Sequence, residues 1–328
     1  MNTFFATLTP MLTLFACIAT GFALSKCKIL PESSSKVMAR LETWIFCPAL
    51  SFMTMVRFCT VESIGLHLTN IILALAGVVL AISMAILLAR FFVKEKSAER
   101  DVYTYALAFA NAGYAGDPIV LALFGDVVLS YYKLFYLPFS LAINSWGVGI
   151  LMPRTEQNGS FWKRLLNPPT IAMVAGIVMG LSGLGECLPT FFVNTLDSLK
   201  VCMGPVAMLL AGVTIAKYDF LAMLKKKKVY VVTGLRLVVL PIVMVAFIFG
   251  LKTLANAVLG TSINNDVLFL AFFGTATALG LNTVVFPEAY GGNPETGASM
   301  AMISHTLCIL SIPLMYALMV AVFGVPFQ

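Results

Sequence analysis

Residues 111–118 read Asn-Ala-Gly-Tyr-Ala-Gly-Asp-Pro and stand in the middle of a long apolar stretch. Pro118 lacks an N–H group and therefore frees the backbone carbonyl of Tyr114, four residues earlier. Gly113 and Gly116 let the backbone leave the helical conformation at low steric cost. Because an unpaired backbone group costs several kcal/mol in lipid, a helix broken here needs polar partners or a water-filled cavity. A proline kink packed by neighbouring helices is the alternative interpretation.

The composition around this segment excludes a soluble protein. Of the 328 residues, 60% are hydrophobic and 11% are charged, whereas ordinary soluble domains are about 45–50% apolar and about 25% charged. So few charges cannot cover the surface of a soluble domain of this size. Ten long apolar stretches predict an all-α polytopic membrane protein with ten transmembrane helices. The stretches lie near residues 8–25, 36–56, 66–92, 102–124, 128–152, 168–185, 192–216, 229–251, 266–289 and 296–323.

The positions of Lys and Arg predict the orientation of the chain. Fifteen of the 21 Lys and Arg residues fall in the first, third, fifth and seventh loops, while Arg57, Lys133 and Lys252 fall on the opposite side. By the positive-inside rule the odd loops are cytoplasmic, so both termini of a ten-helix chain face outward. The net charge of +6 then belongs mostly to membrane-flanking loops, and we expect a lipid bilayer and no nucleic acid as partner.

The two halves of the chain resemble each other. Residues 111–118 followed by Gly125 align with residues 277–284 followed by Gly291, and several earlier Gly and Pro positions align at a similar offset. Each unit holds five stretches, an odd number, so the second unit must enter the membrane from the other side. Such inverted repeats are typical of secondary transporters. The expected units are residues 1–152, a cytoplasmic linker at 153–166, and residues 167–328.

The ninth apolar stretch contains a polar segment that matches the one in the fourth. It includes Thr277, Gly280, Asn282 and Thr283. If the repeats are inverted, the two breaks meet near the centre of the bilayer. We expect Asn111 and Asn282 to donate amide hydrogen bonds to one small ligand there.

Several ionisable residues within the stretches have more than one interpretation. Asp117 either coordinates a coupling cation or proton, or caps the second half of its helix, and we favour capping. Glu288 and His305 are further candidates for ion coupling. Arg236 counters an anionic substrate, snorkels to the interface or pairs with an acid. Glu42, near the start of the second stretch, is expected to be an interfacial charge.

Other function classes lack their motifs. The sequence contains no Walker A motif, no His-Glu-x-x-His motif and no Cys-x-x-Cys pair, and it has only two His. We therefore expect no enzyme activity, no metal and no cofactor. An anion channel remains an alternative, because pores also use broken helices.

Five motifs stand along the chain in the order found in a known family. They are Pro48-Ala49-Leu50-Ser51-Phe52, Asn111 to Pro118 followed by Gly125, Asn167-Pro168-Pro169, Arg236 to Pro241, and Tyr290-Gly291 followed by Ser304 to Pro313. The sequence resembles the auxin efflux carrier family, which includes plant auxin exporters and bacterial permeases for dicarboxylates such as malonate. The resemblance covers essentially the whole chain.

The resemblance implies two inverted five-helix repeats in which the broken helices 4 and 9 cross. Helices 1, 2, 6 and 7 would form a scaffold, helices 3–5 and 8–10 a transport domain, and the scaffold a homodimer contact. In the plant carriers, the Asn of the fourth helix and the backbone at the crossing bind the substrate carboxylate. Carried over, that residue is Asn111, with Gly113, Tyr114 and Gly116 beside it and Pro118 making the break.

The ninth stretch departs from the family pattern. Relatives usually carry a proline early in this crossing, about where Ala278 lies, whereas here the only proline of the stretch is Pro287. The long cytoplasmic loop of many plant members is also missing, which indicates a bacterial carrier of the inner membrane.

We therefore expect a secondary transporter that moves a small organic anion, a carboxylate, by an elevator-type alternating-access mechanism. The alternative within this class is a carboxylate symporter driven by Na⁺ or H⁺ through Asp117, Glu288 or His305. The sequence names neither the substrate nor the direction of transport.

Overall fold

The structure is a computed structural model that describes residues 2–152, 167–219, 225–290 and 294–327. The expected linker at 153–166 lies outside the described residues, as does Gly291. Within the described ranges the regular structure is helical, apart from one isolated β-bridge. Each of the predicted apolar stretches is helical over most of its described length.

The helices follow the expected stretches, and several stretches are divided into two helices. The first half contains α1 (Asn2–Lys26), α2 (Ser34–Leu41), α3 (Cys47–Phe58), α4 (Val61–Phe92), α5 (Ala98–Ala108), α6 (Asp117–Ala142) and α7 (Val148–Leu151). The second half contains α10 (Pro168–Ser182), α11 (Thr190–Ala216), α13 (Lys227–Gly234), α14 (Leu240–Leu259), α15 (Asp266–Thr275), α16 (Asn282–Tyr290) and α17 (Pro294–Phe323).

Five helical segments among the described residues are long and apolar enough to cross a membrane. They are His67–Phe92, Val127–Leu151, Thr190–Ala216, Lys227–Leu259 and Pro294–Phe323. Three shorter apolar helices accompany them, Phe15–Lys26, Pro168–Ser182 and Asp266–Thr275. The polytopic helical class predicted from composition is therefore present in the structure.

Four helices contain π-helical turns, and prolines account for three of them. Turns at Glu42–Phe46, Ala112–Gly116 and Leu235–Val239 each end two residues before a proline. In each turn the N–H of the residue before that proline, such as Cys47, donates to the carbonyl five positions back. The wider turn makes room for the proline ring, which would otherwise clash with the carbonyl four positions back. The fourth turn, Ile143–Gly147, joins α6 to α7 without a proline.

Gly125 makes the corner between the fourth and fifth stretches. Its φ of 78° lies in the region that glycine adopts readily, and the backbone leaves the helix there although α6 continues on both sides. The corner falls close to the boundary expected from the sequence, between 124 and 128.

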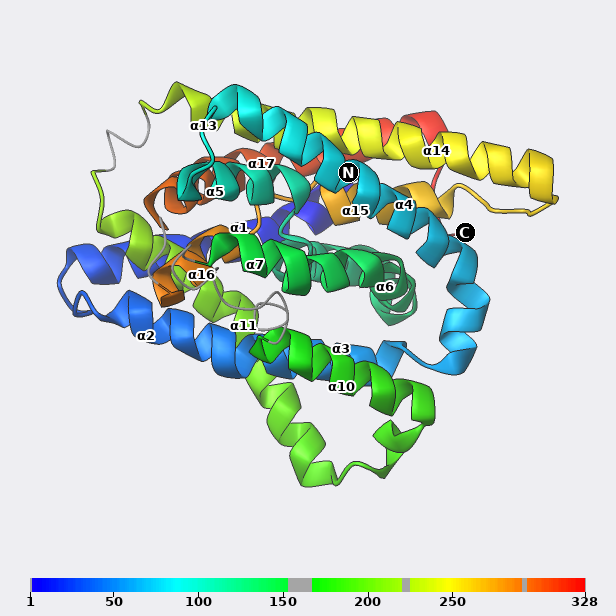
Figure 1. Cartoon of the computed structure of the whole chain (residues 1–328), viewed down its shortest axis with the longest axis horizontal. Coiled ribbons are helices and arrows are strands. Elements are labelled where there is room, and N and C mark those ends of the chain that lie inside the picture. The colour runs from blue at the N-terminus through cyan, green and yellow to red at the C-terminus, as the bar shows by residue number, and fades with distance from the viewer. Residues whose placement is uncertain (1, 153–166, 220–224, 291–293, 328) are drawn as a thin grey trace.

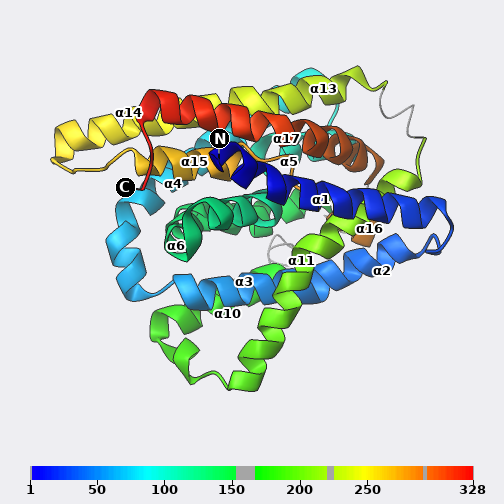
Figure 2. The ribbon, with the colours of Figure 1, turned by 180° about the vertical axis from the view of Figure 1, so that it is seen from behind.

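The helices form two groups. In one group, α1 packs against α11, and α3 packs against both α10 and α11. In the other group, α4 packs against α5 and α6, and α14 against α15. Figures 1 and 2 both show α3 beside α10 on one side of the molecule and α14 with α17 on the opposite side. Contacts of α17 with α1 and α11 connect the groups.

Backbone contact holds α1 against α11. A Cβ added at Gly212 would stand 2.0 Å from the carbonyl oxygen of Ile18, and one added at Gly21 would stand 2.2 Å from that of Leu209. Small residues at such contacts let membrane helices approach closely and gain van der Waals packing.

We predict that Gly212→Ala lowers the melting temperature of the purified protein. The added methyl group meets backbone that cannot move aside, and overpacking of this kind typically costs about 1–3 kcal/mol. Gly204→Ala is the matched control on the same helix, because nothing lies within 4 Å of a Cβ added there. Equal melting temperatures of the two variants would contradict the close α1–α11 contact.

Candidate functional site

Two helices are broken in the interior. Regular structure stops at Ala108, the end of α5, and resumes at the π-helical turn that begins at Ala112. In the second half α15 ends at Thr275 and α16 begins at Asn282, with non-helical backbone between them. The first break therefore ends at Asn111, seven positions before Pro118, and the proline is accommodated by the π-helical turn instead of making the break itself.

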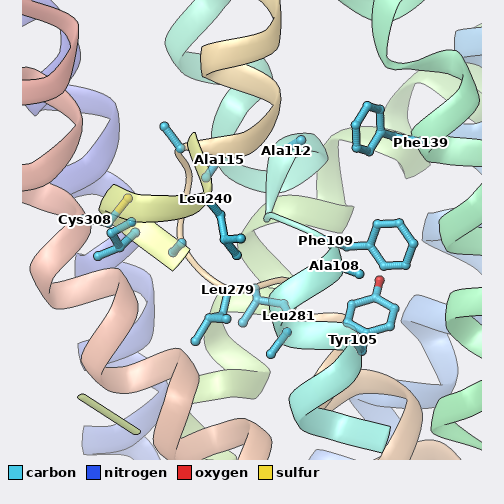
Figure 3. Packing of buried hydrophobic residues seen from close by; sticks show 14 of the residues in the cluster. Tyr105, Ala108, Phe109, Ala112, Ala115, Phe139, Leu240, Leu279, Leu281 and Cys308 are labelled. Carbon is cyan, nitrogen blue, oxygen red and sulfur yellow. The ribbon is translucent and has the colours of Figure 1, made fainter. Parts of the chain in front are cut away.

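The two breaks meet and share hydrogen bonds. Ala110 and Leu279 form an antiparallel β-bridge, and the backbone N–H of Asn111 donates to the carbonyl of Ala278 at 2.8 Å. Figure 3 shows the extended chain at Leu279 and Leu281 close to the gap between Ala108 and Ala112. Each break supplies partners for backbone groups that the other has freed, which offsets part of the cost of leaving the helix.

Ala278 also resolves the departure from the family pattern. The second break forms without a proline at this position. The N–H of the next residue, Leu279, donates to the hydroxyl of Ser304 at 3.3 Å. Bonds from neighbouring segments thus replace the local effect of a proline.

A cavity of about 100 Å³ lies beside the crossing. Both breaks line it, through Asn111, Gly113, Gly280, Leu281 and Asn282. The facing wall comes from the other helix group, with residues that include Cys47, Ser51 and Thr54 near α3, Met173 in α10 and Met203 in α11. The cavity therefore lies between the two helix groups, and the crossing forms one of its walls.

The side-chain amide of Asn111 is hydrogen-bonded through its nitrogen but not through its oxygen among the described residues. Asn111 is 2% exposed, and its amide nitrogen lies 3.0 Å from Nε2 of His305 in α17. His305 in turn places Nδ1 2.8 Å from the carbonyl of Ala301. The amide oxygen of Asn111 is buried and has no hydrogen-bond partner among the described residues.

The other predicted residues of the second break are mostly engaged within the protein. The amide nitrogen of Asn282 donates to the hydroxyl of Tyr105 at 2.7 Å, and the hydroxyl of Thr283 donates to the carbonyl of Gly280 at 2.9 Å. Thr277 is buried, and its hydroxyl has no partner within the described ranges. The amide nitrogens of Asn111 and Asn282 thus each make one hydrogen bond within the protein in this conformation.

Aromatic rings pack around the first break. The rings of Tyr105 and Phe109 meet edge to face with centroids 5.2 Å apart, and Figure 3 shows the two rings beside each other. Gly116 is confined as well, because a Cβ there would stand 2.5 Å from the hydroxyl of Tyr132. The backbone of Tyr114 belongs to the π-helical turn between these positions.

Asp117 forms an ion pair with Lys133, and both residues line the cavity. The expected placement of Lys133 in an outer loop is therefore wrong, since this residue lies within α6 in the apolar segment Val127–Leu151. Asp117 is the first residue of α6 and makes no side-chain cap. Asp117 thus forms an ion pair with Lys133 instead of the expected helix cap. The residues next to Asp117 and Lys133 in the sequence do not indicate this pairing.

Glu288 lies away from the cavity. Its carboxylate accepts from the ammonium of Lys217 and from the hydroxyl of Ser35, each at 2.5 Å. Since Lys217 follows α11 and Ser35 lies in α2, this contact joins α16 to α2 and to the end of α11. Tyr218, in the loop after α11, has a raised pKa because of its burial and of the nearby Glu288 and Glu295 carboxylates.

Arg236 supports the first break from behind. Its guanidinium is buried and donates through Nη1 to the carbonyl of Leu107 at 3.1 Å. That carbonyl belongs to the last turn of α5, where the helix dipole is negative and a cation is stabilising. Arg236 does not line the cavity. In this conformation it therefore does not contact an anion bound in the cavity.

Sequence reasoning missed the burial of Glu42. We expected an interfacial charge, but Glu42 is 0% exposed, and neither carboxylate oxygen has a hydrogen-bond partner among the described residues. It lies in the π-helical turn before Pro48, and that turn contacts α10, α11 and α16. Pro48 was the sequence signal that could have indicated this burial. A π-helical turn before a proline rotates the side chains that precede the proline, including that of Glu42.

These features define the class of the protein, because a pair of broken helices that cross beside a cavity within apolar helices is the arrangement of membrane transporters. The model of a family described as membrane transport protein matches residues 6–316 of the chain. The chain belongs to this family, that of the auxin efflux carriers, and the resemblance noted in the sequence is confirmed. No curated protein matches the chain. Membership makes the protein a multi-pass membrane transporter, a class distinct from enzymes.

We predict that Lys133→Met destabilises the fold by up to about 3–5 kcal/mol, because it leaves the Asp117 carboxylate, whose side chain is 17% exposed, without its partner. The double variant Asp117→Asn, Lys133→Met removes both charges and is expected to recover most of the lost stability. Thermal unfolding of the purified proteins measures both changes. A double variant no more stable than the single variant would contradict the charge pair.

Proposed function

We propose that the protein is a secondary transporter that carries a small organic anion, a carboxylate, by elevator-type alternating access. The observation that supports this most directly is the hydrogen-bonded crossing of two broken helices beside a cavity. A substrate held at such a crossing can move together with the helices that carry it. Family membership supports the transport function itself.

Our proposal divides the chain into ten transmembrane helices in two inverted repeats, residues 1–152 and 167–328. The scaffold comprises α1, α2 with α3, α10 and α11, and the transport domain comprises the remaining helices. The division is supported by the packing of α1 and α3 against α11 and by the position of the cavity between the two groups. We further propose a homodimer through the scaffold in a bacterial inner membrane with both termini outside, as the family resemblance implies.

The chemistry of the cavity favours a carboxylate. The first N–H groups of a helix lack intrahelical partners, and their partial positive charge attracts anions. The π-helical turn that leads into α6, and α16, both begin at the crossing. Lys133 adds a cation to the same wall, although Asp117 balances it. A cavity of about 100 Å³ fits a small acid.

We predict that Asn111→Ala reduces carboxylate uptake at least about tenfold, since loss of one hydrogen bond to a charged group costs about 1.5–3 kcal/mol. Uptake of radiolabelled malonate and acetate into proteoliposomes measures the effect. Asn194→Ala is the matched control, because Asn194 is exposed on α11 far along the chain from both breaks.

Two outcomes would contradict the proposal. Wild-type uptake by Asn111→Ala would remove this residue from the binding site. Unitary currents in a planar bilayer, in place of saturable uptake, would assign the protein to the channels.

A further inference from the structure

The hydrogen bonds of His305 fix its neutral form. Nδ1 lies 2.8 Å from the carbonyl oxygen of Ala301, and a carbonyl can only accept, so Nδ1 carries the proton. In a neutral imidazole Nε2 is then the acceptor. The group 3.0 Å from Nε2 must therefore donate, which assigns that position to the NH₂ of Asn111.

This assignment decides what Asn111 offers to the cavity. His305 uses one of the two N–H donors of the Asn111 NH₂, and the amide oxygen, which is buried, has no partner among the described residues. An ionised carboxylate has only acceptor oxygens. The neutral form of the His305–Asn111 pair therefore withholds one donor and leaves a bare acceptor, which disfavours a carboxylate.

A proton on Nε2 of His305 reverses this arrangement. Both ring nitrogens of the imidazolium are donors, so the amide oxygen of Asn111 becomes the group that must face His305. A half-turn of the amide about χ2 brings the oxygen to Nε2 and releases the NH₂. The released NH₂ can donate to a carboxylate beside the crossing.

No other charge holds His305 in either form within the described parts of the chain. The described contacts of the His305 ring are to the amide of Asn111 and the carbonyl of Ala301, and neither group is charged. Ionisable side chains on the elements packed against α17 include Lys26 of α1, Tyr105 of α5, Lys217 after α11, Lys227 and Lys228 of α13, Arg236, and Glu288 of α16, and no hydrogen bond or ion pair joins these to His305. Asp117, a carboxylate that lines the cavity together with Asn111, is already paired with Lys133, so the counter-charge for an imidazolium comes from what enters the cavity.

We propose that the protein binds a carboxylate together with one proton, which Nε2 of His305 takes up as the amide of Asn111 turns over. The proton comes from water on the side to which the cavity opens, and no covalent bond to the substrate forms or breaks. The imidazolium and the carboxylate enter as a neutral pair, which avoids an uncompensated buried charge. This inference rests on the proposed function and adds its coupling ion.

The test measures protons directly. Acetate, which carries the single charge of the proposed neutral pair, is titrated into purified protein at pH 7.5 in weak buffer with a pH indicator, and malonate, which carries two charges at this pH, is the second probe. We expect about one proton taken up for each carboxylate bound, and binding that weakens about tenfold for each unit of rising pH. In proteoliposomes, an inwardly acidic gradient is expected to slow uptake and an outwardly acidic gradient to speed it.

The chain offers a matched pair of variants, because His67 is its other histidine. His305→Gln keeps an amide that can bond to Asn111 but cannot take up a proton, and we expect its binding to lose both the proton uptake and the pH dependence. His67→Gln is expected to keep both, since the ring of His67, in α4, lies tilted against that of Tyr131 with centroids 4.5 Å apart and does not line the cavity. Melting curves confirm that the variants are folded, and His305→Asn serves if the first variant is not.

The outcomes separate the two proposals. Binding by the wild-type protein without proton uptake would overturn the coupling and leave the carboxylate carrier standing. Proton uptake that persists in folded His305→Gln would overturn the role of His305. Failure of every probe to bind or to be transported would overturn the proposed function and the coupling together.

Discussion

The site depends on the hydrogen bond from the Asn111 N–H to the Ala278 carbonyl, which pairs two backbone groups that the broken helices leave free. In an apolar environment every backbone N–H and C=O needs a partner, so a helix can be interrupted only where another segment supplies one. The two breaks supply each other, through this bond and the bridge between Ala110 and Leu279. Neither break would be stable alone, and their meeting therefore places the polar groups of both at one point.

The rest of the interior is arranged around that point. Arg236 takes a carbonyl left at the end of α5, and Ser304 takes an N–H of the second break. The π-helical turn before Pro118 returns the chain to the helix without a clash. The Asn111 oxygen remains unpaired among the described residues, and Asn111 lines the cavity. The site thus includes a polar group that the described parts of the protein do not satisfy.

The local sequence predicted where the two broken helices cross, but it did not predict which side chains from other helices contact the crossing. Asn111, Gly113, Gly280 and Asn282 line the cavity because Gly and Asn mark places where a helix in lipid is interrupted. The break itself lies earlier than Pro118, since a π-helical turn absorbs the proline. Asp117 and Lys133 are 16 positions apart and Asn111 and His305 are 194 apart, while the burial of Glu42 depends on contacts with other helices. No local pattern encodes such contacts, which arise only when the helices pack.

The contact of Glu288 with Lys217 and Ser35 has a mechanical consequence. It ties α16, which leads away from the crossing, to α2 and to the end of α11 in the other helix group. Any travel of the crossing past those helices must first pull this ammonium and carboxylate apart. Partly hydrated ion pairs are weak, typically about 0–1 kcal/mol. The Lys217–Glu288 ion pair therefore favours one position of α16 against α2 and α11. It is too weak to prevent the movement that the proposed mechanism requires.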